Sequence, residues 1–237
     1  MEPKPYEGQK RSRENDSDSL ALGLSSGVNR SSHLNFHPEF SKSGALKGVR
    51  VVGVFGDALK ESLRWSAQKY VVPTLSFEIG RDEITDLDFV AKMRDLLRDT
   101  GTKGESIELL MAEENVISNP NDAIRTILKL RELVVPCGIR GFTLLEGARL
   151  DLRSLSLSSL RVNAAALFHA TSAVESLWLA RTVISIARRG CIRLVAEGVE
   201  TEEQRVILLA GGCEYLSGPL FGRELNSNEF EVLMSRG

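Results

Sequence analysis

Short apolar runs alternate with amphipathic helical segments along most of the chain, and this alternation constrains the fold more than any other feature. Strands that alternate with helices are typical of α/β folds with a parallel sheet. Eight strands within 237 residues fit a barrel of the TIM type, in which helices surround a closed sheet. The runs that resemble strands are residues 33–40, 49–56, 73–80, 106–113, 139–146, 159–166, 192–198 and 213–222.

The connection between the first two strands differs from the later ones. Residues 41–48, "SKSGALKG", are polar and contain glycine, and they leave no room for a helix. Strands joined so closely pair as an antiparallel hairpin, whereas strands joined through a helix run parallel. We therefore predict a modified (β/α)8 barrel of the α/β class with an antiparallel first strand.

Three helices and one helix start are well marked. The helix expected at residues 85–101 ends at Gly101. The helix expected at residues 121–133 begins with Asn121 or Asp122 as its N-cap. Thr201 and Gln204 have the spacing of a capping box, which predicts a helix start at Thr201. The expected core positions on these helices are Phe89, Val90, Met93, Leu96 and Leu97, then Ile124, Ile127, Leu128 and Leu130, and on residues 172–190 Val174, Leu177 and Trp178.

Composition narrows the class of protein. Residues 1–17 are polar and charged, so we expect a disordered tail there and a barrel domain over residues 18–237. The net charge of −2 gives no indication of nucleic-acid binding. The most apolar helical stretch contains Arg181 and is too short to span a membrane. The three cysteines lack metal-ligand spacing, and no signal peptide begins the chain, so a cytoplasmic location is expected.

The last third of the chain, "VAEGVETEEQRVILLAGGCEYLSGPLFGREL", closely resembles EAL domains, the bacterial cyclic di-GMP phosphodiesterases. The resemblance extends to "LNFHPEF" and "VRVVGVFG", which look like the opening hairpin of that family, and more weakly through the middle of the chain. It implies a barrel whose acidic strand ends bind two divalent ions, usually magnesium or manganese, and cleave a phosphodiester. Such ions require oxygen ligands.

Most acidic positions of the family are replaced in this sequence. The glutamate of the EAL signature aligns with Phe55, or has shifted to Asp57. Leu144 and Leu145 align with the paired aspartates of the DDFG motif, and Leu110 with the first acid of the E-x-T-E motif. The remaining matches are Glu113, Glu197 and Glu200, which are retained, and Glu78, Arg161, Asn163 and Ser217, which replace an asparagine, a lysine, an aspartate and a glutamine.

Without these carboxylates, two dications would lack compensating charge, so we expect no metal site and no catalytic residues. Glu113, Glu197 and Glu200 are then vestigial acids. Glu113 would end its strand in solvent, while Glu197 and Glu200 would cap the helix at Thr201. The shortened segment after the second strand predicts that Arg64 and Trp65 belong to a helix, not to a substrate-binding RW motif.

These substitutions leave three hypotheses for function. The first is a degenerate EAL domain that acts through an unknown regulatory protein in bacterial signalling, without a cofactor. Its apolar replacements Phe55, Leu110, Leu144 and Leu145 would be either core filling or a docking surface at the mouth of the barrel. The second is a cyclic di-GMP receptor without hydrolysis, using Glu78, Arg161 and Asn163. The third is a phosphodiesterase with residual activity that depends on magnesium or manganese.

Overall fold

The computed structural model describes residues 34–147, 150–152, 155–168 and 172–236, so the expected tail at residues 1–17 lies outside the described residues. Eight strands form a closed barrel in which each strand pairs with its neighbours in chain order, and β8 pairs with β1. The strands are β1 (Asn35–Ser41), β2 (Leu46–Val52), β3 (Thr74–Ile79), β4 (Ile107–Ala112), β5 (Cys137–Arg140), β6 (Ser159–Asn163), β7 (Arg193–Glu197) and β8 (Tyr215–Leu216).

The direction of β1 confirms the prediction made from the short polar connection. β1 runs antiparallel to β2 on one side and to β8 on the other, while every pair from β2–β3 to β7–β8 is parallel. The expected strand at residues 139–146 ends at Arg140, and Leu144 already begins a helix. The last strand is also shorter than expected, because the chain turns away after Leu216.

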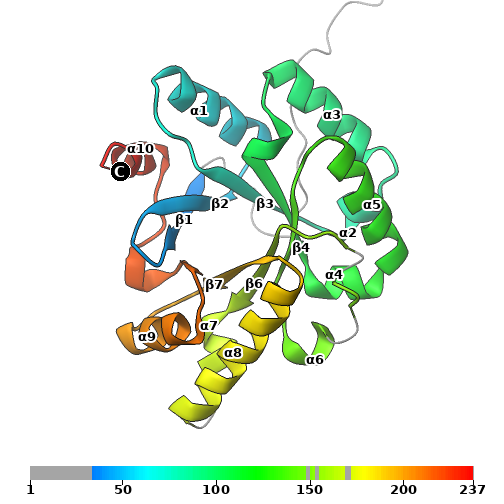
Figure 1. Ribbon diagram of the computed structural model, residues 1–237. Helices are drawn as coiled ribbons and strands as arrows, with labels where there is room; N and C mark the ends of the chain where they lie inside the picture. The colour runs from blue at the N-terminus through cyan, green and yellow to red at the C-terminus, as the bar shows by residue number, and fades with distance from the viewer. Residues whose placement is uncertain (1–33, 148–149, 153–154, 169–171, 237) are drawn as a thin grey trace, which may run out of the picture.

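Helices surround the barrel in the view along its axis (Figure 1). They are α1 (Phe55–Ala67), α2 (Arg81–Thr85), α3 (Phe89–Thr100), α4 (Glu113–Ser118), α5 (Pro120–Glu132), α6 (Leu144–Gly147), α7 (Ala164–Phe168), α8 (Ala173–Arg189), α9 (Glu202–Gly211) and α10 (Ser227–Met234), with short 3-10 turns η1 (Gly104–Ser106) and η2 (Pro219–Phe221).

Local sequence signals gave mixed results for these helices. All five expected core residues of α3 are buried, and the helix ends at Gly101 with a left-handed φ of 68°. α5 begins two or three residues earlier than expected, with Asn119 as N-cap and Pro120 in the first turn. Leu128 is 47% exposed, so its predicted core position was wrong. The predicted core positions of Val174 and Trp178 on α8 were also wrong, because these side chains are 78% and 64% exposed.

The outer face of the barrel packs against the helices through large apolar side chains. Phe36 on β1 stacks on Phe230 of α10 with ring centroids 5.0 Å apart and meets Trp65 of α1 edge-on at 5.4 Å. All three side chains are fully buried. Truncating a buried aromatic of this kind typically costs about 3–5 kcal/mol. This cluster fixes the antiparallel strand β1 to the first and last helices.

The described helices also bear on the membrane prediction. None of them combines the length and the apolar character needed to cross a bilayer.

Candidate functional site

Charged side chains from several strands meet at the mouth of the barrel, where the parallel strands end. Arg140 at the end of β5 donates from Nε to Glu197 of β7 at 2.9 Å. Its Nη1 also donates to Glu78 of β3 at 3.2 Å. Arg50 of β2 lies 3.8 Å from the other oxygen of Glu197. The carboxylates at the mouth are therefore bound by guanidinium groups.

Below the mouth, Arg161 of β6 extends into the barrel interior and is fully buried. Its Nη2 donates to Glu108 of β4 at 2.7 Å and to Ser76 of β3 at 2.8 Å. Its Nη1 donates to Glu39 of β1 and, at 3.2 Å, to Glu197. We call Arg161, Glu39, Glu108, Glu197 and Ser76 the buried network, which connects five of the eight strands.

Electrostatics favour the ionised forms of Glu108 and Glu197 despite their burial, but not that of Glu39. Burial opposes ionisation of Glu108, but the positive charges of Arg161 and Arg193, with hydrogen bonds from Ser158 and Arg161, outweigh it and lower its pKa to about 2. Burial likewise opposes ionisation of Glu197, yet Arg161, Arg140 and Arg50 lower its pKa. Burial raises the pKa of Glu39 more than its contact with Arg161 lowers it.

The interior is balanced in charge as a whole. Each of the four glutamates in the described barrel strands lies within 4 Å of at least one guanidinium group. Among the described side chains, no group of three or more His, Cys, Asp or Glu residues is arranged to hold a metal ion. The facing groups are Arg50, Arg140, Arg161 and Arg193 on one side and Glu39, Glu78, Glu108 and Glu197 on the other.

The three retained acids have separate structural roles. Glu113 begins α4 and is buried, not in solvent as predicted, because it accepts hydrogen bonds from the backbone N (3.1 Å) and the hydroxyl (2.9 Å) of Thr143. Burial raises the pKa of Glu113. Glu200 is exposed, and its backbone N donates to Gln204. Glu197 points into the mouth, so the prediction that it caps α9 was wrong.

The helix start at α9 confirms the separate prediction of a capping box formed by Thr201 and Gln204. The Thr201 hydroxyl accepts from the backbone N of Gln204, and the Gln204 side chain accepts from the backbone N of Thr201. Gly198, in the turn before it, has a φ of 72°. Gly218 approaches this turn so closely that a Cβ there would lie 2.2 Å from the backbone N of Val199. The turn before α9 therefore requires glycine at positions 198 and 218, the first for its φ and the second for its close approach to Val199.

The three residues predicted to bind ligand are only partly brought together. Glu78 and Arg161 are connected through Arg140 and Glu197. Asn163 is exposed, and its Oδ1 accepts from the backbone N of Ala165, which caps the short helix α7. Because Arg161 has no exposed surface, it cannot contact a dinucleotide in this structure. Its predicted ligand role is therefore corrected to a structural one.

The apolar replacements do not form one exposed surface. Phe55 and Leu110 are fully buried, and the ring of Phe55 lies 4.3 Å from that of Phe77. Leu144 is half-buried, packs against the core and lines a hollow of about 320 Å³ beside α8, while the side chain of Leu145 lies outside the described residues. Of the two roles considered, Phe55 and Leu110 have that of core filling, and they cannot form a docking surface at the mouth.

Arg64 and Trp65 lie in α1, which confirms the prediction that they belong to a helix. The Trp65 indole donates to Glu231 of α10 at 3.3 Å, and Arg64 donates to the same oxygen at 2.7 Å. These two residues therefore join the first and last helices, away from the mouth.

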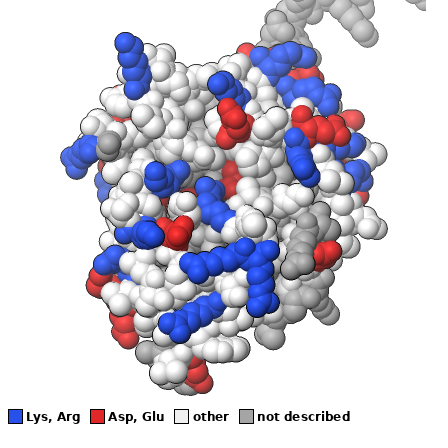
Figure 2. Space-filling view, viewed as in Figure 1, with Lys and Arg blue, Asp and Glu red and all other residues white. Residues whose placement is uncertain are grey.

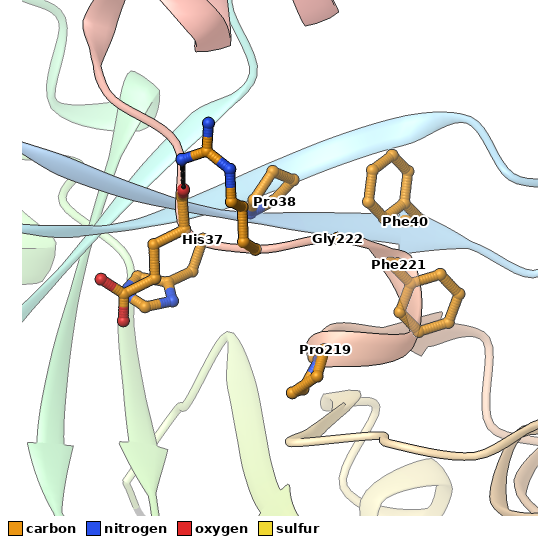
Figure 3. Close-up of a pocket in the computed structure, with 9 residues that line it drawn as sticks. His37, Pro38, Phe40, Pro219, Phe221 and Gly222 are labelled. Carbon is orange, nitrogen blue, oxygen red and sulfur yellow. Dashed lines mark hydrogen bonds and ion pairs between the residues drawn. The ribbon is translucent and has the colours of Figure 1, made fainter.

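A second hollow, of about 400 Å³, lies beside the mouth between β1 and η2 (Figure 3). Pro219 and Phe221 line it from η2, with Pro38 and Phe40 from β1, and the rings of Phe40 and Phe221 are 5.7 Å apart. His37 lies at the other end of the hollow from Phe40 (Figure 3). Burial and the nearby Arg50 lower the pKa of His37 to about 4, so it is neutral at pH 7.

Sequence reasoning missed the residues that carry most of the interior charge: Glu39, Arg50, Glu108, Arg140 and Arg193. Each is a charged residue within or at the end of a barrel strand. That pattern was the available signal, because a buried charge in a barrel strand requires a partner on another strand.

Comparisons with known proteins agree with this geometry. The EAL domain model matches residues 29–224. The cyclic di-GMP phosphodiesterase NbdA of Pseudomonas aeruginosa is 29% identical over 147 residues, which cover 62% of this chain and 18% of NbdA. The cyclic di-GMP phosphodiesterase RocR of the same species is 24% identical over 66% of this chain and 40% of RocR. The chain thus spans less than half of either relative.

Solved structures support the fold. The EAL domain of Mycobacterium smegmatis DcpA superposes with a TM-score of 0.77 at 23% identity, covering 86% of this chain and 98% of that one. The Xanthomonas citri FimX EAL domain in complex with c-diGMP gives 0.69 at 16% identity, covering 81% and 87%. Together with the matched residues, the barrel with its reversed first strand shows that the chain belongs to the EAL domain family.

Proposed function

We propose that this chain is a degenerate EAL domain that has lost phosphodiester hydrolysis and acts in bacterial signalling through interaction with another protein. The observation that carries the proposal is the pairing of the mouth carboxylates with arginines. Arg140 binds Glu78 and Glu197 together, and Arg161 binds Glu197 from below. Glu113, the retained acid directly after β4, is bound by Thr143 and lies outside this arginine pairing.

Two divalent ions do not fit this arrangement. Mg²⁺ and Mn²⁺ need several oxygen ligands that bring negative charge. At the mouth, the oxygens of Glu197 face Arg50, Arg140 and Arg161, so an added dication would meet three guanidinium charges within one small site. Leu144 aligns with an aspartate of the family and brings no ligand. Like charges at such distances in a partly buried site are strongly unfavourable.

A complete barrel of the family that lacks the family's metal ligands supports a role in binding. Because Phe55 and Leu110 are core residues, these two do not provide a docking surface at the mouth, which was one of the two roles considered. Exposed apolar side chains occur instead on the outer helices, where Trp178 of α8 has the largest ring.

The proposal is tested by incubating the chain with cyclic di-GMP and either magnesium or manganese, with a catalytically active EAL domain as the positive control. We expect no linear dinucleotide from this chain under conditions in which the control substrate is consumed. Linear product that forms in proportion to protein concentration, and is lost in Glu197→Gln, would overturn the proposal.

A second candidate function is a cyclic di-GMP receptor. Its supporting observation is that the Arg140 side chain remains 36% exposed at the mouth, where it can meet a phosphate. Calorimetry with cyclic di-GMP at high micromolar concentration separates the two candidates. An interaction domain gives no heat of binding. A receptor gives a heat of binding that is lost in Arg140→Met. The control variant Arg205→Met should keep this heat, because Arg205 lies on α9 and pairs with Glu202.

A further inference from the structure

One stripe of side chains on α8 faces solvent along almost the whole helix. Val174, Trp178, Arg181, Ser185 and Arg188 follow each other at intervals of four and three residues, which places them on one helix face. All five are exposed, with Val174 at 78% and Trp178 at 64%. At 1.5 Å per residue the stripe is about 21 Å long. We call these five residues, with the adjacent Arg189, the α8 stripe.

The basic end of the α8 stripe borders a hollow next to the end of α9. Arg181, Arg188 and Arg189 line this hollow of about 410 Å³, together with Ser185 and Gly211. Figure 2 shows basic side chains gathered over α8 in the lower half of the view. Gly211 allows the close approach of the two helices, because a Cβ there would already lie 3.1 Å from Ile184.

These three arginines differ from most arginines on the other helices. Within the described ranges no carboxylate lies at ion-pair distance from Arg181 or Arg189, and Arg188 donates only to the backbone carbonyl of Gly212 at 3.2 Å. By contrast, several arginines elsewhere on the surface are paired with carboxylates of the chain itself: Arg64 with Glu61 and Glu231, Arg98 with Asp95 and Asp99, Arg125 with Asp122, Arg205 with Glu202, and Arg223 with Glu229. Among the described residues, Arg81, Arg94 and Arg131 on other helices also lack such a partner, so what distinguishes α8 is that three such arginines line one hollow on a helix with an exposed tryptophan.

We propose that the α8 stripe is a docking surface for an acidic amphipathic segment of a partner protein, with apolar side chains against Val174 and Trp178 and carboxylates against the arginines. An exposed tryptophan beside arginines is the composition of interface hot spots. Unpaired guanidinium groups require an acidic partner, and the apolar half of the stripe favours a protein over a nucleic acid. The length of the stripe corresponds to about four turns of a partner helix.

This inference rests on the proposed function, since it names the surface and the partner chemistry through which an interaction domain would act. The test uses a labelled 16-residue helical peptide with leucine on one face and glutamate beside it, and a matched peptide with glutamine in place of glutamate. A DNA duplex of equal charge is the third probe. Binding is measured by fluorescence anisotropy at low and high salt.

We expect the glutamate peptide to bind about tenfold or more tightly than the glutamine peptide, with affinity that falls as salt increases. Trp178→Ala and the pair Arg181→Gln with Arg189→Gln should each weaken it by about tenfold. Arg98→Gln with Arg205→Gln is the matched control on other helices and should leave binding unchanged. Equal binding of both peptides, equal binding by the variants, or preference for the duplex would overturn the inference.

The same samples are assayed for hydrolysis of cyclic di-GMP. Product formation would refute the proposed function whatever the peptides do, whereas failure of the peptides alone would refute only the α8 stripe.

Discussion

Arg161 of β6 and Glu108 of β4 form an ion pair of 2.7 Å in the centre of the barrel, and both side chains are almost completely buried. Arg161 also contacts Glu39 and Glu197, so one guanidinium group serves three carboxyl groups. Buried charge of this kind is stable only while every partner remains. Stability, more than ligand binding, should therefore respond to changes in the buried network.

Arg161→Met should destabilise the fold by about 3–5 kcal/mol at pH 7, because it removes the guanidinium partner of Glu39 and one of the partners of Glu108 and of Glu197 in the buried interior. The loss should shrink at lower pH as these carboxyl groups take up protons. Urea unfolding at several pH values measures both effects. Arg98→Met, at a surface pair on α3, is the control and should change stability by less than about 1 kcal/mol. An equal loss at all pH values would contradict the role of the three carboxylates.

Acid should unfold the protein partly through Glu108. Its pKa falls from an ordinary value of 4.5 in the unfolded chain to about 2 in the fold. A group whose folded pKa is lowered adds stability above its unfolded pKa and loses it as pH falls through the folded pKa. We expect stability to decline between about pH 4.5 and 2, by roughly 3 kcal/mol from this group. In Glu108→Gln, which is less stable at neutral pH, the slope of stability against pH in this range should be shallower.

His37 gives a separate pH dependence at milder acidity. Its pKa is lowered from 6.5 to about 4, so between these values the unfolded chain binds a proton that the folded protein does not. Stability should therefore fall as pH decreases from 6.5 to 4, on the order of 3 kcal/mol from this group. His37→Gln should flatten the curve in that range. An NMR titration of the imidazole that gives a midpoint near 6.5 would contradict the prediction.

Thiol chemistry should distinguish the three cysteines. Cys191 is exposed, whereas Cys137 and Cys213 are buried. Burial raises the pKa of the Cys137 thiol to about 12 and that of Cys213 to about 11, so both are protonated at neutral pH. A thiol reagent at pH 8 should modify one cysteine rapidly in the native protein and three after unfolding. The fast phase should be absent in Cys191→Ser.

The sequence predicted those features that depend on neighbouring residues. The polar connection at residues 41–48 was enough to reverse β1, and the spacing of Thr201 and Gln204 was enough to start α9. Gly101 ended α3 for the same local reason. Each of these signals lies within a few residues, so no knowledge of the tertiary fold was needed.

Features that depend on strand register were missed. Glu108 and Arg161 are 53 residues apart in sequence, and their contact follows only from how β4 and β6 tilt around the barrel. Leu110 was expected at an open mouth, but register places it inside the packed interior. Trp178 was misplaced for the opposite reason, because helical spacing alone does not say which face of α8 meets the barrel.

The carboxyl groups that share Arg161 also restrict the order in which substitutions can occur in such a domain during evolution. Removing this arginine to free carboxylates for a cation first leaves buried acids uncompensated, while adding acids first increases their mutual repulsion. Either order passes through a poorly folding intermediate before any new ligand is gained. On the proposal of a degenerate domain, the buried network would therefore hinder the return of a metal site.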